Sequence, residues 1–174
     1  EMKELEGYMR KIVSKLDYKG VLYAGVMKTE NGFFILEFNC RFGDPEAQVI
    51  LQLLDSDLCQ IMLDCINSNN LEIKWIDLYA SNIILSHTLY PTNKLSTPTP
   101  IEINSDLDSG IKCYFGNIQI QDGKYHTNGG RVMSIVSKSD NIYQSFNNIY
   151  NNIDKIRYDN SYYRRDIGIK YMTK

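Results

Sequence analysis

Two β-prone segments near the start of the chain constrain its fold more than any other feature. Residues 21–28 and 33–39 are rich in aliphatic and aromatic side chains, and the short link between them contains Asn31-Gly32. The Asn-Gly pair is strongly preferred in the tight turns that join neighbouring antiparallel strands. The sequence therefore predicts a β-hairpin in the first quarter of the chain.

Polar side chains occupy alternate positions at the end of the second predicted strand. Because side chains alternate between the two faces of a strand, Glu37, Asn39 and Arg41 are expected to share one face, opposite an apolar one. A carboxylate and an amide oxygen two residues apart suit a hard divalent cation such as Mg²⁺. An arginine beside them can bind phosphate oxygens bidentately. The alternative is a solvated strand face with an incidental ion pair.

The strand leads into Gly43-Asp44-Pro45-Glu46, which predicts a tight turn and the start of a helix. Pro45 suits the first turn of that helix, and Asp44 is its expected cap. Helical spacing of apolar residues predicts further helices over residues 2–17, around 58–65 and over 142–153, the last after the capping candidates Ser139 and Asp140. Short strands are predicted at residues 79–85, 101–103, 111–120 and 131–137.

Composition excludes several classes of protein. The 174 residues carry a net charge of -2, with 43% hydrophobic and 23% charged residues, and the basic residues are dispersed, so a nucleic-acid partner is not expected. No apolar stretch is long enough to span a bilayer, and the charged start does not suit a secretory signal. The four cysteines are expected to be buried free thiols, which predicts a cytoplasmic location. The first residue is not Met, so we expect the chain to be part of a longer protein.

Two further motifs lie in the second half of the chain. Residues 127–131, Thr-Asn-Gly-Gly-Arg, predict a polar turn that enters a strand, where paired glycines could let backbone N–H groups approach an anion; a plain hairpin turn is the alternative. Residues 162–168, Tyr-Tyr-Arg-Arg-Asp-Ile-Gly, are expected to anchor the tail through an Arg–Asp pair and stacked tyrosines. His87 and His126 have no acid or thiol partner nearby in sequence, and both are interpreted as structural or surface residues.

Four of these segments, in order, resemble the phosphoribosylamine–glycine ligase (glycinamide ribonucleotide synthetase) family. They are residues 20–25 (Gly-Val-Leu-Tyr-Ala-Gly), 36–46 (Leu-Glu-Phe-Asn-Cys-Arg-Phe-Gly-Asp-Pro-Glu), 127–132 and 162–168. The resemblance implies an α+β fold within the ATP-grasp superfamily. Residues 1–74 would be the C-terminal part of the ATP-grasp domain and residues 75–174 the small C-terminal domain. The N-terminal part of the enzyme would be missing, so this chain alone is expected to be inactive.

The family resemblance also implies a reaction and roles for the motif residues. ATP phosphorylates glycine, and 5-phosphoribosylamine attacks the glycyl phosphate to give glycinamide ribonucleotide, ADP and phosphate in purine biosynthesis. Glu37 and Asn39 would hold Mg²⁺ or Mn²⁺ against the ATP phosphates. Arg41 would stabilise the transferred phosphoryl group or the glycine carboxylate, while Gly43 and Asp44 would shape the acceptor end of the site.

The resemblance extends to substrate contacts from the C-terminal domain, which are expected at Gly129, Gly130 and Arg131. The chain departs from the family pattern at Leu89, where a glycine is usual, and at Tyr114, where a histidine is usual. Two other functions stay open. One is another ATP-grasp carboxylate–amine ligase with a different acceptor, and the other is a non-catalytic interaction module derived from the enzyme.

Overall fold

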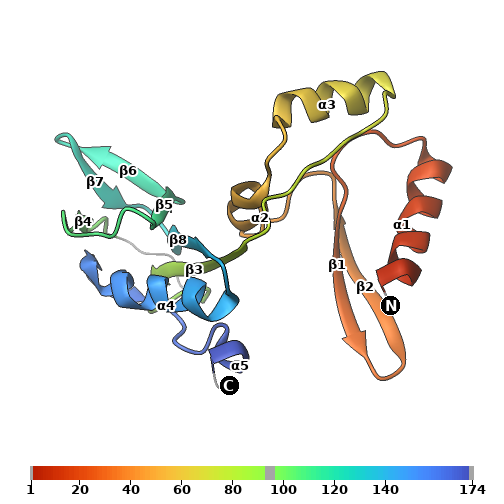
Figure 1. Ribbon diagram of the computed structural model, residues 1–174. Helices are drawn as coiled ribbons and strands as arrows, with labels where there is room; N and C mark the ends of the chain where they lie inside the picture. Colours follow the sequence, from red (N-terminus) through yellow and green to blue (C-terminus); the bar gives the residue numbers. More distant parts are fainter. Residues whose placement is uncertain (1, 93–96, 173–174) are drawn as a thin grey trace. The chain divides into compact units, whose positions relative to one another are not determined.

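The computed structural model describes residues 2–92 and 97–172. The chain forms two compact units, one made of Glu1–Ala47 with Leu54–Trp75 and the other of Gln48–Leu53 with Ile76–Lys174. Both units mix helices with strands, and every strand pair of the described residues is antiparallel (Figure 1). The predicted α+β class is therefore confirmed.

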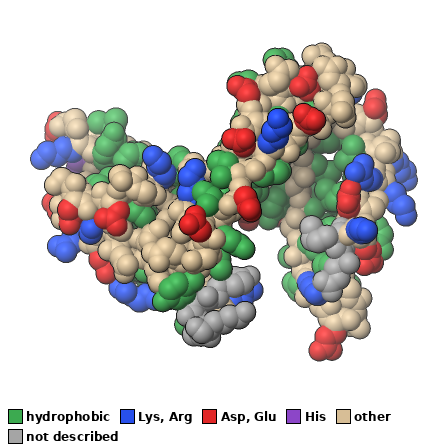
Figure 2. Space-filling model, viewed as in Figure 1, with side chains coloured by type: hydrophobic (Ala, Val, Ile, Leu, Met, Phe, Trp, Pro, Cys, Tyr) green, Lys and Arg blue, Asp and Glu red, His purple; other side chains and the backbone are tan. Residues whose placement is uncertain are grey.

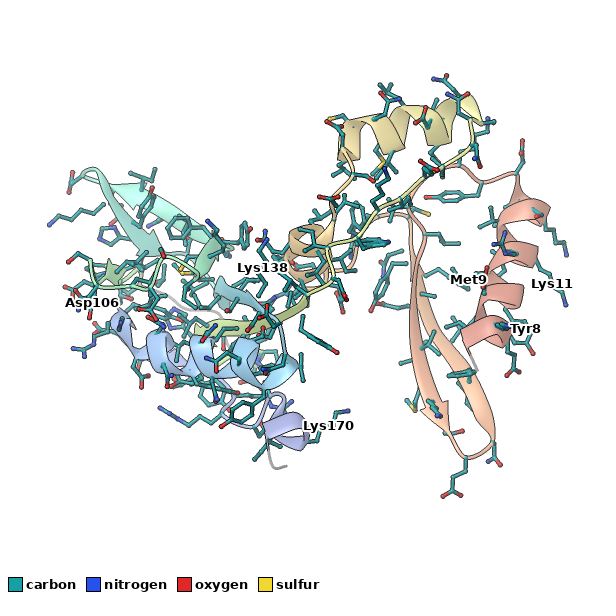
Figure 3. The ribbon with its side chains drawn as sticks, viewed as in Figure 1. Tyr8, Met9, Lys11, Asp106, Lys138 and Lys170 are labelled. Atoms are coloured by element: carbon teal, nitrogen blue, oxygen red, sulfur yellow. The ribbon has the colours of Figure 1, made fainter. Side chains whose placement is uncertain are left out.

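The first unit consists of helices and the predicted hairpin. Its elements are α1 (Met2–Leu16), β1 (Tyr23–Thr29), β2 (Gly32–Asn39) and α3 (Leu58–Asn67), while α2 (Ala47–Leu53) begins in this unit and continues in the other. Helix α1 is amphipathic: Met9 lies on the side toward the hairpin and Lys11 on the outer side (Figure 3). The turn of the hairpin contains Gly32 at φ +111°, a conformation that glycine adopts without strain. The expected hairpin and N-terminal helix are confirmed.

The apolar face of the hairpin is largely exposed within this chain. Leu36 and Phe38 are 62% and 44% exposed. The prediction of buried cysteines is wrong, because Cys40 and Cys59 are exposed and Cys65 and Cys113 are only half-buried. Apolar neighbours in the sequence indicated burial, but among the described residues β2 pairs with a single strand, β1, and a two-stranded sheet buries little of its own surface. All four thiols are free, as expected.

The second unit is built around a four-stranded sheet in the order β10-β3-β8-β5. Its elements are β3 (Tyr79–His87), β4 (Glu102–Ile103), β5 (Lys112–Phe115), β6 (Ile118–Gln121), β7 (Lys124–Thr127), β8 (Arg131–Ser139), α4 (Ile142–Asn152), a 3₁₀ turn (Ile153–Lys155), β9 (Ile156–Arg157), β10 (Ser161–Tyr162) and α5 (Ile169–Met172). Helix α4 packs against β3 and β8 (Figure 1). The core lies between them and includes Ile83, Leu85, Val132, Ile135, Phe146 and Ile149.

Buried polar contacts fix helix α4 on the sheet. The hydroxyls of Ser81 and Ser145 are 2.6 Å apart, and Ser145 also donates to the carbonyl of Ser137 at 2.9 Å. At the end of the helix, Asn152 is 1% exposed; its Nδ2 donates to Asp108 Oδ2 at 2.8 Å, and its Oδ1 accepts from the backbone N–H of Asp108 at 3.2 Å. Short hydroxyl side chains thus let the helix approach the sheet closely without leaving these polar atoms unpaired.

Three sequence expectations need correction. Residues 111–120 form two strands, because β5 pairs with β8 whereas β6 turns away to pair with β7. Helix α2 begins at Ala47, with Glu46 at the N-cap position, so Asp44 is not its cap. Helix α4 is capped by Asn141, whose Oδ1 accepts the backbone N–H of Gln144 at 2.7 Å, and not by Ser139 or Asp140.

The Arg–Asp pair predicted for the tail is confirmed, whereas Tyr163 meets the ring of Tyr150 at a tilt, with centroids 6.4 Å apart, and does not stack on it. Arg164 forms two hydrogen bonds to Asp166 at 2.9 and 2.6 Å, and Tyr163 donates to Asp154 at 2.8 Å. Arg165 stacks on the Tyr163 ring, with its guanidinium carbon 4.7 Å from the ring centroid. Burial, with help from the Asp154 carboxylate, raises the pKa of Tyr163 to about 12. The aromatic and charged residues of this motif therefore hold residues 162–168 on their own unit.

Charge is distributed evenly over the part of the surface that can be seen. On the face drawn in Figure 2, basic and acidic side chains are interspersed and form no patch of a single sign. No helix of the described residues is both long and apolar enough to span a membrane.

Candidate functional site

The polar residues at the end of β2 form a continuous hydrogen-bonded row. Asn39 Nδ2 donates to Glu37 Oε1 at 3.1 Å, and Arg41 Nη2 donates to Asn39 Oδ1 at 3.3 Å. The other terminal nitrogen of Arg41, Nη1, donates to the carbonyl of Phe42 at 2.8 Å. Glu37 and Arg41 are exposed and Asn39 is half-buried, so the row is open to a ligand. The three side chains therefore share one face, as the alternation along the strand predicted.

The chemistry of this row fits a hard divalent cation. Glu37 offers carboxylate oxygens and Asn39 an amide oxygen, and Mg²⁺ binds through one or two carboxylates while retaining waters or substrate phosphates. A half-turn of the Asn39 amide would bring its oxygen, in place of Nδ2, beside Glu37 Oε1. Among the described residues no three His, Cys, Asp or Glu side chains gather in one cluster, and Glu37 and Asn39 would supply only part of the ligands of such a cation. Glu37 and Asn39 are thus the residues that could hold a metal here.

The turn after this row begins with a buried glycine, Gly43. Gly43 accepts the backbone N–H of Ala47 at 2.9 Å, which closes the turn that leads into α2. On its other side Gly43 lies against Glu46 and Tyr23: an added Cβ would be 2.3 Å from Glu46 Oε2 and 2.9 Å from Tyr23 Cε2. Only a glycine fits this position without displacing both side chains. Asp44 follows with an exposed side chain.

Charged residues of both the row and the turn act on the side chain of Tyr23. It donates from Oη to Glu46 Oε1 at 3.2 Å, and its Cα pairs with that of Asn39 in the hairpin register. The Glu46 carboxylate is the largest cause of a raised Tyr23 pKa, followed by burial; Glu37 adds to the rise and Arg41 opposes it. The pKa of the Tyr23 hydroxyl therefore depends on charged residues of both the row and the turn.

The second group of predicted site residues belongs to the other unit. Residues 127–131 connect β7 with β8, which do not pair with each other, so the segment is not a plain hairpin turn. Its glycines are explained by packing: an added Cβ at Gly129 would lie 2.1 Å from Asn117 Nδ2, and one at Gly130 would lie 2.1 Å from Tyr90 Cδ2. Arg131 is half-buried at the start of β8. These contacts explain why a glycine stands at both positions.

His87 is the most deeply buried titratable side chain near this segment. It is 1% exposed, and neither ring nitrogen has a hydrogen-bond partner among the described residues. Its backbone N–H donates to the carbonyl of Gly130 at 3.0 Å, and its ring meets that of Tyr158 edge-on, with centroids 5.2 Å apart. Burial lowers the pKa of His87 below its ordinary value. The interpretation of His87 as a structural residue agrees with this burial.

Comparison with known proteins decides the family. Residues 80–170, more than half of the chain, match the family model described as phosphoribosylglycinamide synthetase, C domain. The chain belongs to the phosphoribosylglycinamide synthetase family. Residues 3–47, which contain the row of Glu37, Asn39 and Arg41 and the whole turn that follows it, match the ATP-grasp (A) domain of the same family.

Relatives of this phosphoribosylglycinamide synthetase chain are longer than the chain itself. A phosphoribosylamine–glycine ligase of Clostridium acetobutylicum is 32% identical over 156 residues, which are 88% of this chain and 37% of the relative. A trifunctional purine biosynthetic protein adenosine-3 of Gallus gallus is 37% identical over 174 residues, 97% of this chain but 17% of the relative. The chain thus spans little more than a third of the single-function ligase that it matches.

Solved structures agree with this family and its fold. A phosphoribosylamine–glycine ligase from Thermotoga maritima matches 83% of this chain and 36% of its own, with a TM-score of 0.70 and 27% sequence identity. The biotin carboxylase domain of the Hydrogenobacter thermophilus 2-oxoglutarate carboxylase matches 99% of this chain and 40% of its own, with a TM-score of 0.65. That second match has 12% identity and supports the fold alone.

Sequence reasoning found the row but missed the two residues that connect it to the turn. Glu37, Asn39 and Arg41 are in contact, and Gly43 and Asp44 follow in the same unit, whereas Gly129, Gly130 and Arg131 belong to the other. Tyr23 and Glu46 were not predicted as site residues, although both stand inside the family-like segments. Their contact depends on the strand register, which a bulge between Gly25 and Val26 shifts by one residue. The signal that could have found them is Gly43, because a glycine in a polar segment can mark a place where other side chains approach the backbone closely.

Proposed function

We propose that this chain is part of a phosphoribosylamine–glycine ligase. The enzyme would couple ATP cleavage to the ligation of glycine with 5-phosphoribosylamine through a glycyl phosphate, giving glycinamide ribonucleotide, ADP and phosphate in purine biosynthesis. The observation that carries the proposal is the hydrogen-bonded row of Glu37, Asn39 and Arg41, at the end of a strand that matches the family's ATP-grasp domain.

In this proposal the side chains of the row divide the work of the phosphoryl transfer. Glu37 and Asn39 would hold Mg²⁺ or Mn²⁺, which neutralises phosphate charge when bound. Arg41 carries a guanidinium that can contact the transferred phosphoryl group or the glycine carboxylate. Asp44, exposed on the turn, offers a carboxylate to the glycine ammonium, and Gly43 would shape this end of the site because its lack of a side chain lets Glu46 and Tyr23 lie close to its backbone.

We further assign residues 1–74 to the C-terminal part of the ATP-grasp domain and residues 75–174 to the small C-terminal domain. Gly129, Gly130 and Arg131 would reach substrate from the latter. Because the relatives are much longer, the N-terminal part of the same enzyme is the expected partner, and this chain alone should not turn over. Half of a nucleotide site offers too few contacts to offset the cost of binding. Four free cysteines favour a reducing compartment, and we propose the cytoplasm.

The test is ADP release that depends on both glycine and 5-phosphoribosylamine, measured with Mg²⁺ on the full-length gene product. Glu37→Gln and Asn39→Ala should each lower the rate at least about 100-fold, because a bound metal contributes several kcal/mol to such reactions. Glu30→Gln, an equivalent change at the exposed tip of the hairpin, is the control and should leave the rate unchanged.

The same assay separates the alternatives. Turnover with another carboxylate or amine in place of glycine or 5-phosphoribosylamine would identify a different ATP-grasp ligase. No turnover with any acceptor would refute the enzyme proposal and favour a non-catalytic interaction module.

A further inference from the structure

Tyr23 and Glu46 form a side-chain pair that the metal and phosphate roles leave unused. Tyr23 begins β1, directly opposite Asn39, and Glu46 is the last residue before α2. The two are joined by the hydrogen bond from Tyr23 Oη to Glu46 Oε1 at 3.2 Å, although 23 positions separate them in sequence. The bond therefore ties the first strand of the hairpin to the turn that follows the second.

The pair also covers the glycine on which the turn rests. The atoms nearest to the place where a Gly43 Cβ would stand belong to these two side chains: Glu46 Oε2 at 2.3 Å, and Glu46 Cδ and Tyr23 Cε2 both at 2.9 Å. On the backbone, the N–H of Ala47 donates to the Gly43 carbonyl at 2.9 Å. Gly43 is thus held by a side-chain pair and by one backbone hydrogen bond, and Asp44 directly follows it.

We propose that Tyr23 and Glu46 are positioning residues that set the place of the Gly43-Asp44 turn relative to the row of Glu37, Asn39 and Arg41. The effect that we expect on enzyme kinetics rests on the proposed function, in which this turn forms the acceptor end of the site. The hydroxyl of Tyr23 donates a hydrogen bond to the carboxylate of Glu46 and so fixes its position. The fixed carboxylate lies against Gly43 and keeps the Gly43-Asp44 turn near the strand. Neither side chain needs to touch a substrate for this role.

The first test uses this chain by itself and does not depend on any activity. The exchange rate of the Ala47 amide, measured by NMR or mass spectrometry, reports on the Ala47–Gly43 hydrogen bond. Tyr23→Phe, which removes only the hydroxyl, should raise this rate about fivefold. Glu46→Ala should have the same effect, whereas Glu46→Gln keeps an acceptor oxygen and should stay near the wild-type rate. Tyr8→Phe, the same change at an exposed tyrosine of α1, is the matched control.

A double-mutant cycle then asks whether the two residues act as one unit. If they do, Tyr23→Phe has no further effect in a Glu46→Ala background. Additive effects, or an unchanged exchange rate in Tyr23→Phe, would overturn the proposed contact between strand and turn.

The second test uses the full-length protein. Tyr23→Phe should lower kcat/KM for glycine about tenfold through a raised KM, with KM for ATP unchanged, and Glu46→Gln should stay within about twofold of the wild type. If Glu46→Gln loses as much activity as Glu46→Ala, the Glu46 charge acts directly on the reaction and the positioning role is wrong. If the wild-type protein shows no glycine-dependent turnover, the proposed function and this kinetic role both fail, while the exchange measurement still decides the contact between Tyr23 and Glu46.

Discussion

The buried imidazole of His87 should make the second unit sensitive to mild acid. The ring is 1% exposed and lacks a hydrogen-bond partner among the described residues, and burial lowers its pKa below the ordinary 6.5. Below about pH 6.5 the unfolded chain therefore binds a proton at this position that the native chain does not bind. The free energy of unfolding must then fall as the pH falls.

The size of this loss has an upper limit. One proton of difference between the two states changes the free energy of unfolding by about 1.4 kcal/mol per pH unit. Between about pH 6.5 and 5 the loss due to His87 is thus at most about 2 kcal/mol. His87→Leu should remove this slope. At pH 7 the variant loses the ring contact with Tyr158, about 0.5–1.5 kcal/mol, but also the unpaired buried N–H, about 1–3 kcal/mol, so it should be as stable as the wild type or more so.

The assay must report on the second unit. The single tryptophan, Trp75, belongs to the first unit, so urea unfolding is better followed through the NMR signals of β3 and β8. The chain has two histidines, and a His126→Gln variant leaves His87 as the only imidazole whose titration can be observed. The reasoning is refuted if His87 titrates at or above pH 6.5, or if His87→Leu keeps the wild-type pH slope.

Two further changes should destabilise the second unit by mechanisms that the structure specifies. Asn152→Ala removes hydrogen bonds to both the side chain and the backbone of Asp108 and should lower the free energy of unfolding by about 2–4 kcal/mol in urea titrations; Asn151→Ala, its exposed neighbour, should cost less than about 0.5 kcal/mol. Gly168→Ala places a Cβ 2.4 Å from the Phe146 ring at a φ of +75° and should lower the melting temperature, with a cost above about 1 kcal/mol. An equal melting temperature for Gly168→Ala and Gly110→Ala, where a Cβ meets nothing within 4 Å, would contradict this account.

Local patterns predicted the elements whose structure is decided locally. The Asn31-Gly32 pair indicated the hairpin, and helical spacing of apolar residues indicated α1 and α4, which the structure confirms. The break within residues 111–120 could not be read in this way. Whether that segment continues as one strand depends on β8 and β7, which lie further along the chain and draw its two halves into different sheets.

The residues of the candidate site also fall into those that local patterns predict and those that depend on contacts far apart in sequence. The row of Glu37, Asn39 and Arg41 follows from strand alternation alone, and so it could be predicted. The contact of Tyr23 with Glu46 depends on a register that a bulge shifts, and the exposure of Cys40 depends on which elements cover the strand. Asp44 was expected as a cap because its residue type suits one, but the helix begins three residues later.

The path of the chain through the two units has a consequence for how the protein forms as it is synthesised. Residues 48–53 belong with the second unit, yet they emerge from the ribosome before residues 54–75, which complete the first. The side chain of Gln52 pairs with that of Tyr114, 62 positions later, and the carbonyl of Leu53 accepts the backbone N–H of Ile76. Helix α2 therefore cannot form its contact with Tyr114 until strands β3 and β5 of the later sheet have been made. A cut at any single bond between residues 48 and 75 would divide the chain segments of both units.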